Sequence, residues 1–307
     1  MKNIFFYLLL CSSLFSDAQT QQNINKNTGT VSNAISNIDS IRFTGSSSIM
    51  EVVLENGTIE SHSISDILNA NFTLSNQNSC DVTDVLNPNL NYGSMTDQEG
   101  TIYKTIVIGN QEWMAENLKT SVYRNGDAIA NVTDNAQWHE LTTAAWCSYY
   151  NDSQFECPFG KLYNWYVIAD PRNVCPAGWH VPSDDEWNIL LVTLDPQTDI
   201  TAIGPQYSNA GAKLKSEGTQ YWTSPNEFAN NESGFSALPA GARNYAIGEF
   251  YNGVLESNLT GNSSAWWSST MISPTASWYR NLSHSTADVW RGGALGQMGF
   301  SVRCIKN

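Results

Sequence analysis

The sequence predicts an α+β protein in two parts, a small β module followed by a larger domain of short strands and two helices. Composition changes along the chain, because all eleven Trp lie at or beyond Trp113 and all ten Pro at or beyond Pro88. The larger part combines alternating segments with one well-capped helix, and its tail is rich in Gly, Asn and Ser. This order predicts long loops and short strands, and it lacks the repeated strand–helix unit of a parallel sheet.

The chain starts with the pattern of a signal peptide, residues 1–18. A short basic start precedes the apolar residues 4–15, and small side chains stand at 16 and 18, the two positions that a signal peptidase reads. The apolar stretch is too short to span a bilayer, which needs about 20 residues. We therefore predict export, with release from the cell or display on its outer surface. Lipidation of Cys11 is the rival interpretation, although the residue before it is not small.

A small β module is predicted at 35–73, after a polar segment at 19–34 whose Asn, Gln and Thr predict a flexible leader. The module contains a weak repeat, in which Ile-Ser-Asn-Ile at 35–38 recurs as Ile-Ser-Asp-Ile at 64–67. Between the two copies, Asn56-Gly57 separates two alternating segments. Asn-Gly in this setting is the strongest short-range signal for a β-hairpin.

A polar linker at 74–94 is predicted to lead into the larger domain, residues 95–307. Residues 102–108 alternate between apolar and polar side chains, which predicts a strand. Residues 163–169 form a candidate helix that Pro171 stops.

The clearest helix begins at Ser183, a good N-cap that forms a capping box with Glu186 three residues later. Asp184 and Asp185 fall in the first turn, where negative charge meets the positive end of the helix macrodipole. We expect Pro196 to end the helix. Apolar side chains at i, i+3, i+4 and i+7 give it one buried face: Trp187, Leu190, Leu191 and Leu194.

Four spaced sequence words stand out in this domain. They are Gln-Glu-Trp-Met-Ala-Glu-Asn-Leu at 111–118, Cys-Pro-Ala-Gly-Trp-His-Val-Pro at 175–182, Trp-Trp-Ser-Ser-Thr at 266–270 and Gly-Phe-Ser-Val-Arg-Cys at 299–304. In this order they resemble the Fibrobacter succinogenes major paralogous domain, a family of exported bacterial proteins. The resemblance implies a fold and an exported location, and it implies no ligand because the role of the family is poorly defined.

The order of elements resembles, more distantly, the first half of a C-type lectin-like domain, with a helix, Cys175, Gly178 and a capped second helix. In that fold a Cys near the end of the first helix is bonded to a Cys in the last strand. The resemblance therefore implies a disulfide between Cys175 and Cys304. The words at 179–187 and 299–304 also resemble formylglycine-generating enzymes, which share this fold. The predicted architecture is a C-type lectin-like domain preceded by the small β module.

The other cysteines leave several pairings open. Cys147 and Cys157 bracket a short segment, so we predict a local disulfide between them. Cys80 is then the odd thiol, either free or in contact with a partner chain. The spacing offers no close Cys/His pair such as C-x₂-C for a structural metal.

Charge and motifs exclude several functions. The net charge of −14 is a poor match for nucleic acid, whose phosphates need Lys and Arg, and for anionic lipid. After the signal, no segment is apolar enough to cross a membrane.

Nor do the four His show metal-site spacing, and no Gly-rich or nucleophile motif is present. Ser283-His284-Ser285 with Asp288 contains the residue types of a triad, but a Ser-rich tail produces such clusters by chance. A formylglycine-generating oxidase needs two late thiols a few residues apart, and only Cys304 lies in that region. We therefore predict that the protein is not an enzyme, with this oxidase as the second alternative.

Binding is the function class that the sequence favours, directed at a glycan or an extracellular protein. A lectin-type site would hold calcium through carboxylate and amide oxygens. The Glu-Pro-Asn and Gln-Pro-Asp triplets of that family are absent, so we expect no cofactor and leave calcium as the open alternative.

Aromatic faces can still stack on sugars, and a buried place in the core is the competing interpretation for each of them. The first alternative function is a structural surface or matrix component without a small ligand. The candidate ligand-binding aromatics are Trp222, Trp266, Trp267, Trp278, Tyr279 and Trp290.

Overall fold

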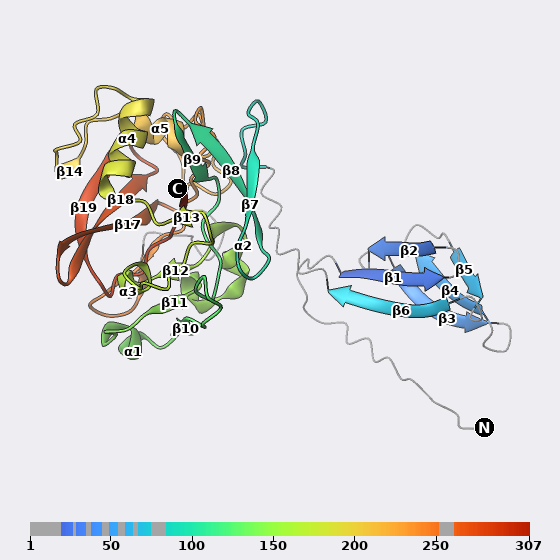
Figure 1. Cartoon of the computed structure of the whole chain (residues 1–307). Helices are drawn as coiled ribbons and strands as arrows, with labels where there is room; N and C mark the ends of the chain where they lie inside the picture. The colour runs from blue at the N-terminus through green and yellow to red at the C-terminus, as the bar shows by residue number, and fades with distance from the viewer. Residues whose placement is uncertain are drawn as a thin grey trace. The chain divides into compact units, whose positions relative to one another are not determined.

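The protein folds as two compact units, residues 1–78 and 79–307, in a computed structural model (Figure 1). The described part of the chain consists mostly of strands with few short helices, all of them in the second unit, which confirms the α+β class at this level. The structure describes residues 20–26, 29–34, 38–44, 49–54, 59–63, 67–74, 84–251 and 261–307.

The first unit contains two antiparallel sheets of three strands, with strand orders β2-β1-β6 and β3-β4-β5. β4 and β5 pair with Val53 opposite Ile59, which confirms the predicted hairpin strands, while their turn and most of the sequence repeat lie outside the described residues. The strands are β1 Thr20–Lys26, β2 Gly29–Ala34, β3 Ile38–Thr44, β4 Ile49–Leu54, β5 Ile59–Ser63 and β6 Ile67–Leu74.

The flexible leader predicted at 19–34 is wrong, because this segment supplies β1 and β2. β1 lies in the middle of its sheet, so its backbone groups pair with β2 on one side and with β6 on the other. Paired backbone groups need no apolar side chains, and Thr, Val and Ile in these strands favour extended structure. A polar composition was therefore a poor guide to disorder here.

Two larger sheets organise the second unit, with orders β13-β20-β9-β8-β7 and β14-β19-β18-β17. The strands are β7 Gly93–Thr96, β8 Ile102–Ile108, β9 Gln111–Met114, β10 Ala130–Asn131, β11 Ala145–Cys147, β12 Leu162–Tyr163, β13 Trp179–His180, β14 Gly204–Pro205, β15 Ala242–Arg243, β16 Phe250–Tyr251, β17 Ser263–Ser273, β18 Ala276–Ser283, β19 Val289–Leu295 and β20 Ile305–Lys306. The helices are α1 Asn135–His139, α2 Glu156–Phe159, α3 Trp165–Ile168, α4 Asp184–Leu194 and α5 Ala210–Leu214.

Several predicted elements are present with changed boundaries. The strand at 102–108 is confirmed as β8, whereas the helix predicted at 163–169 is shorter and begins after the Asn164 N-cap, because the preceding residues pair with β11 as β12. The segment after Trp290 continues as β19 to Leu295. The linker predicted at 74–94 is also wrong, since β7 begins at Gly93 and Val85 is buried in the second unit.

Helix α4 confirms the capping box. The Ser183 Oγ accepts a hydrogen bond from the Glu186 backbone, and the Glu186 carboxylate accepts one from Ser183 N at 2.7 Å. His180 shares this cap, since its Nε2 lies 2.8 Å from the same carboxylate. The apolar face of α4, with Trp187, packs against side chains of both larger sheets in one core.

One disulfide joins Cys175 to Cys304, as the resemblance implies, with a sulfur–sulfur distance of 2.06 Å. The predicted Cys147–Cys157 pair is wrong. Cys147 is a free thiol at the end of β11, where its side chain enters an aromatic core and interacts with the Arg243 guanidinium. Cys157 is disulfide-bonded to a partner outside the described residues, and Cys80 also lies outside them.

A buried amide lies where three of the four sequence words meet. Asn117 Oδ1 accepts hydrogen bonds from Trp266 Nε1 and from Arg303 Nε, both at 2.9 Å. The remaining donors of Arg303 bond to the backbone carbonyls of Met114, Phe235 and Ser236. Burial lowers the pKa of this guanidinium, which stays charged because its intrinsic pKa is so high. Carbonyl and amide oxygens therefore accept the hydrogen bonds of this buried cation, and the charge of Glu116 adds a favourable interaction.

We predict that Asn117→Ala lowers the free energy of unfolding by about 3 kcal/mol, because two buried donors lose their acceptor. Urea denaturation followed by tryptophan fluorescence reports the second unit, which contains every Trp. The matched control is Asn131→Ala, at an exposed position of β10. Equal stability of the Asn117 and Asn131 variants would contradict the role given to the buried amide.

Cys147 is expected to resist alkylation in the folded, oxidised protein at pH 8. Burial raises the pKa of its thiol to about 12, and the thiolate is the reactive form. Peptide mapping should detect the alkylated Cys147 peptide after unfolding in denaturant without reductant. Labelling of Cys147 only after reduction would instead show that this residue forms a disulfide.

Candidate functional site

The four-stranded sheet presents two different faces, which its register defines. Trp266, Arg280 and Arg291 occupy one row across β17, β18 and β19, while the next row holds Ala265, Asn281 and Trp290. Successive side chains along a strand point to opposite faces, so these two rows belong to opposite faces of the sheet.

Helix α4 covers the first face through a buried ion cluster. The two oxygens of Asp184 lie 2.7 Å from Arg280 Nη1 and 2.7 Å from Arg291 Nη2. Burial alone would raise the pKa of Asp184, but the hydrogen bond from Arg291 and the charge of Arg280 outweigh burial and lower it. Asp184 therefore joins α4 to two strands, a role beyond the helix capping expected from the sequence.

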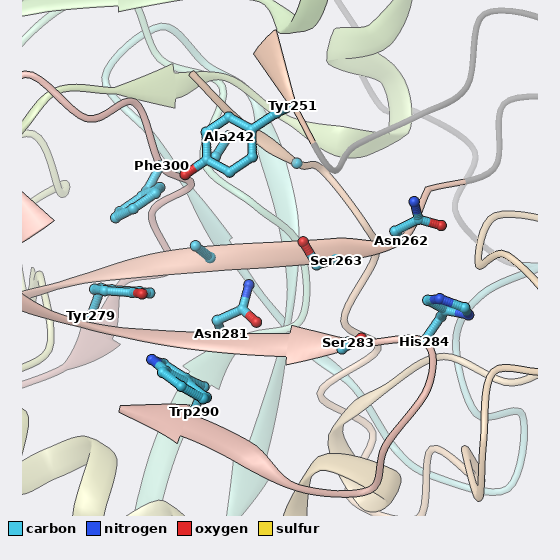
Figure 2. Close-up of a pocket in the computed structure, with 12 residues that line it drawn as sticks. Ala242, Tyr251, Asn262, Ser263, Tyr279, Asn281, Ser283, His284, Trp290 and Phe300 are labelled. Atoms are coloured by element: carbon cyan, nitrogen blue, oxygen red, sulfur yellow. The ribbon is translucent and has the colours of Figure 1, made fainter. Parts of the chain in front are cut away.

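The opposite face is filled at one end and open at the other. Phe300 packs against Trp267 and Tyr279, with ring centroids 4.6 and 4.9 Å apart. Beyond these rings the face opens into a pocket of about 390 Å³. Figure 2 shows Asn281 between the aromatic side chains of this pocket. The lining residues are Gly241, Ala242, Tyr251, Asn262, Ser263, Ala265, Tyr279, Asn281, Ser283, His284, Trp290 and Phe300.

This pocket is called the sheet pocket below. None of its described lining residues is Asp, Glu, Lys or Arg. Burial raises the pKa of Tyr251 to about 12 and also raises that of Tyr279, so both phenols stay neutral. His284 Nδ1 is buried there without a hydrogen-bond partner. The pocket thus combines aromatic faces with neutral hydrogen-bonding groups.

Two contacts hold the polar and aromatic side chains in place. Asn281 Nδ2 donates a hydrogen bond to Ser264 O at 3.0 Å, and the Trp290 indole N–H lies beside the Tyr279 ring and interacts with its hydroxyl. Gly292 makes the second contact possible, because a Cβ there would lie 2.7 Å from Tyr279 Cε1. The glycine therefore provides the space in which the two rings meet.

The six candidate aromatics separate into core and pocket. Trp222, Trp266 and Trp267 are wrong as ligand-binding residues, because all three are fully buried with their indole nitrogens bonded to Ala237 O, Asn117 Oδ1 and Tyr163 O.

The other three candidates are accessible to different degrees. Trp278 lies on the α4 face of the sheet, where the Arg291 guanidinium stacks 3.6 Å from its ring centroid. Tyr279 and Trp290 line the sheet pocket, and Trp290 is 45% exposed.

Sequence reasoning missed the polar half of the pocket. Tyr251, Asn262 and Asn281 carried no motif, although the alternation of residues 276–283 already placed Tyr279, Asn281 and Ser283 on one face. This alternation is visible in the sequence, but only the pairing with the neighbouring strands shows that the shared face lines a pocket.

The triad residue types do not form a hydrogen-bonded relay. Asp288 Oδ1 accepts from the backbone amides of Ser208 and Val289, both at 2.9 Å, while His284 Nδ1 has no partner. Within the described ranges, no group of three or more His, Cys, Asp or Glu side chains is arranged to hold a metal ion. In the same part of the chain, no helix has the length and apolar character to span a bilayer.

These features define an α+β domain in which a disulfide ties an internal segment to the C-terminal region. Residues 106–306 match the Fibrobacter succinogenes major domain, and the chain belongs to this family, as the four sequence words indicated. No curated protein and no solved structure matches the chain.

We predict that Asp184→Asn lowers the free energy of unfolding at pH 7 by about 3–5 kcal/mol, because it leaves the buried Arg280 and the partly buried Arg291 without their carboxylate. The folded-state pKa of Asp184 lies below the unfolded value of about 3.9. Its contribution is therefore complete above that unfolded value and is lost as the pH falls through the folded value.

Urea denaturation of both proteins at a series of pH values tests this dependence. The stability difference should shrink in acid, below about pH 4. Asp185→Asn, an exposed neighbour in the same helical turn, is the matched control and should cost at most about 1 kcal/mol, the size of a helix-dipole contribution. A constant difference between the wild type and Asp184→Asn across this range would contradict the ion cluster.

Proposed function

We propose that this chain is an exported, non-enzymatic binding protein whose sheet pocket accepts a unit of neutral glycan. The observation that carries the proposal is the lining, in which Tyr251, Tyr279 and Trp290 surround the amides of Asn262 and Asn281. Aromatic rings offer apolar faces to the C–H groups of a sugar, and amides pair with its hydroxyls. A volume of about 390 Å³ is within the usual range for small-molecule sites.

The charge of the pocket favours neutral sugars over acidic ones. A sialic or uronic acid would bring a carboxylate into a site whose described lining offers no Lys or Arg. Moving an ion from water into a site without a partner is costly. Calcium is also not required in this proposal, because neutral donors and acceptors suffice for hydroxyl recognition.

For the second unit we propose a C-type lectin-like arrangement. The support is the order of α3, Cys175 and the capped helix α4, followed by a disulfide to Cys304 beside the last strand. Export is proposed from the signal-peptide pattern at residues 1–18 and agrees with a disulfide, which persists in oxidising compartments. The oxidase alternative is disfavoured because Cys304 is buried and bonded to Cys175.

Binding of the purified, oxidised protein to an array of neutral, acidic and amino sugars, with calcium and with a chelator, tests the proposal. Saturable binding to a neutral class in both conditions is the expected result. Absence of binding to every sugar on the array would contradict the glycan proposal and favour a protein partner or a structural surface component. Binding restricted to calcium-containing buffer would contradict a site built from neutral groups.

Trp290→Ala is expected to weaken binding of the best neutral glycan about tenfold, since an aromatic contact contributes about 1.5 kcal/mol. Isothermal titration calorimetry measures the change. Trp278→Ala is the matched control, because this half-buried Trp lies on the adjacent strand but faces α4. Equal losses in the two variants, or a loss only for Trp278→Ala, would place the site elsewhere.

A further inference from the structure

A second cavity, of about 260 Å³, lies beside the loop that follows β18. Three separate loops form it, and the residues that matter are Tyr207, Glu227, Phe228, Thr286 and Asp288. Residues 285–288 form one wall of this cavity, whereas Ser283 and His284 line the sheet pocket. The two cavities therefore share a loop but no lining residue.

Two aromatic side chains of this cavity are exposed to water. Tyr207 is 75% exposed and Phe228 is 72% exposed. Both residues have a left-handed backbone, with φ values of 50° and 58°, a conformation that is costly for bulky residues and persists only where the surroundings impose it. Burial of the rings in a core would offset the strain of this backbone conformation, but these rings lie at the surface. Their placement is therefore better explained by a ligand than by packing.

Backbone hydrogen bonds hold the two aromatic loops in place. The amide directly after Tyr207 donates to Asp288 Oδ1 at 2.9 Å. The Glu227 amide, directly before Phe228, donates to His284 O at 2.7 Å and ties this second loop to the shared wall. Both rings are thus presented from fixed backbone, which lowers the entropy lost when a ligand binds.

The cavity is also acidic. Its described lining contains Glu227 and Asp288 and no Lys or Arg. None of the ion pairs in the described part of the chain involves either carboxylate.

One buried cation lies close to this cavity. The Lys215 ammonium donates to the backbone carbonyls of Glu227, Ser283 and Thr286, at 3.0, 3.0 and 2.9 Å. It interacts electrostatically with the Glu227 carboxylate, and the charges of Lys215, Glu227 and Asp288 together still leave one net negative charge. Lys215 therefore holds the loops in place and does not neutralise the cavity.

We propose that this cavity, the Tyr207–Phe228 pocket, binds an organic ammonium group. Aromatic faces attract a cation through their quadrupoles, and this attraction is the usual basis for recognising quaternary ammonium ligands. Glu227 and Asp288 add a favourable charge that a neutral ligand of the same shape cannot use. The ammonium can belong to a choline-type headgroup or to the lysine side chain of a partner protein. This site is independent of glycan binding in the sheet pocket.

Titration of the full, oxidised protein with three probes tests the proposal by calorimetry. The probes are choline, its uncharged isostere 3,3-dimethylbutan-1-ol, and Nα-acetyl-lysine methylamide. Saturable binding of at least one ammonium probe, at least tenfold tighter than the alcohol, is the expected result. Preference for choline would identify a headgroup as the source, and preference for the lysine derivative would identify a protein side chain.

Variants locate the site. Phe228→Ala should weaken ammonium binding about 3- to 30-fold, the range of a cation–π contact, and Glu227→Gln should weaken it with retention of the fold. Tyr245→Ala and Asp185→Asn are controls at exposed positions outside both cavities, and both should bind as the wild type does. Phe228→Tyr should retain binding, which separates a lost ring from a damaged loop.

Three results would overturn the proposal. They are failure of both ammonium probes to bind, equal binding of the alcohol, and unchanged binding by Phe228→Ala. Because the neutral sugars of the array carry no ammonium group, failure of neutral-glycan binding leaves the ammonium site standing, and the reverse also holds.

Discussion

The second unit depends on one carboxamide, that of Asn117. Its oxygen is the shared acceptor for a buried indole and a buried guanidinium, contributed by Trp266 and Arg303. These donors come from a strand of the four-stranded sheet and from the segment that the Cys175–Cys304 disulfide fixes. A buried donor without an acceptor costs more than a hydrogen bond contributes, so the three segments must meet at this point. Three of the four sequence words therefore contribute to one buried polar core in this chain.

That core determines which surface of the sheet is free. Trp266 and its row turn inward, and the Asp184 ion cluster closes the same face beneath α4. The side chains of the alternate rows must then point the other way. Phe300 fills only part of this second face, so Asn281 and Trp290 are left beside an open pocket. The pocket is thus a consequence of how the interior is packed, and its neutral lining is the basis of the proposed preference for neutral glycans.

Local features were predictable from the sequence, whereas features that depend on distant neighbours were not. The capping box of Ser183 and Glu186 involves residues three apart, and the structure has it as predicted. The predicted Cys147–Cys157 disulfide is wrong because the Cys147 side chain points from β11 into the core. Closeness in the sequence does not reveal this direction. Trp290 resembles every buried Trp in chemistry, and only the strand register shows that it faces the pocket. The disulfide at Cys175 was reached through family resemblance.

The indole N–H region of a two-dimensional ¹H–¹⁵N spectrum tests the central claim most directly. The spectrum of the oxidised, ¹⁵N-labelled protein is recorded during titration with neutral glycans, and variants assign the resonances. The account predicts that the Trp290 signal shifts in a saturable way, because its indole lines the pocket beside Tyr279. The Trp278 signal, on the face toward α4, should stay in place. Saturable shifts at Trp278 with none at Trp290 would contradict a glycan site on this face of the sheet.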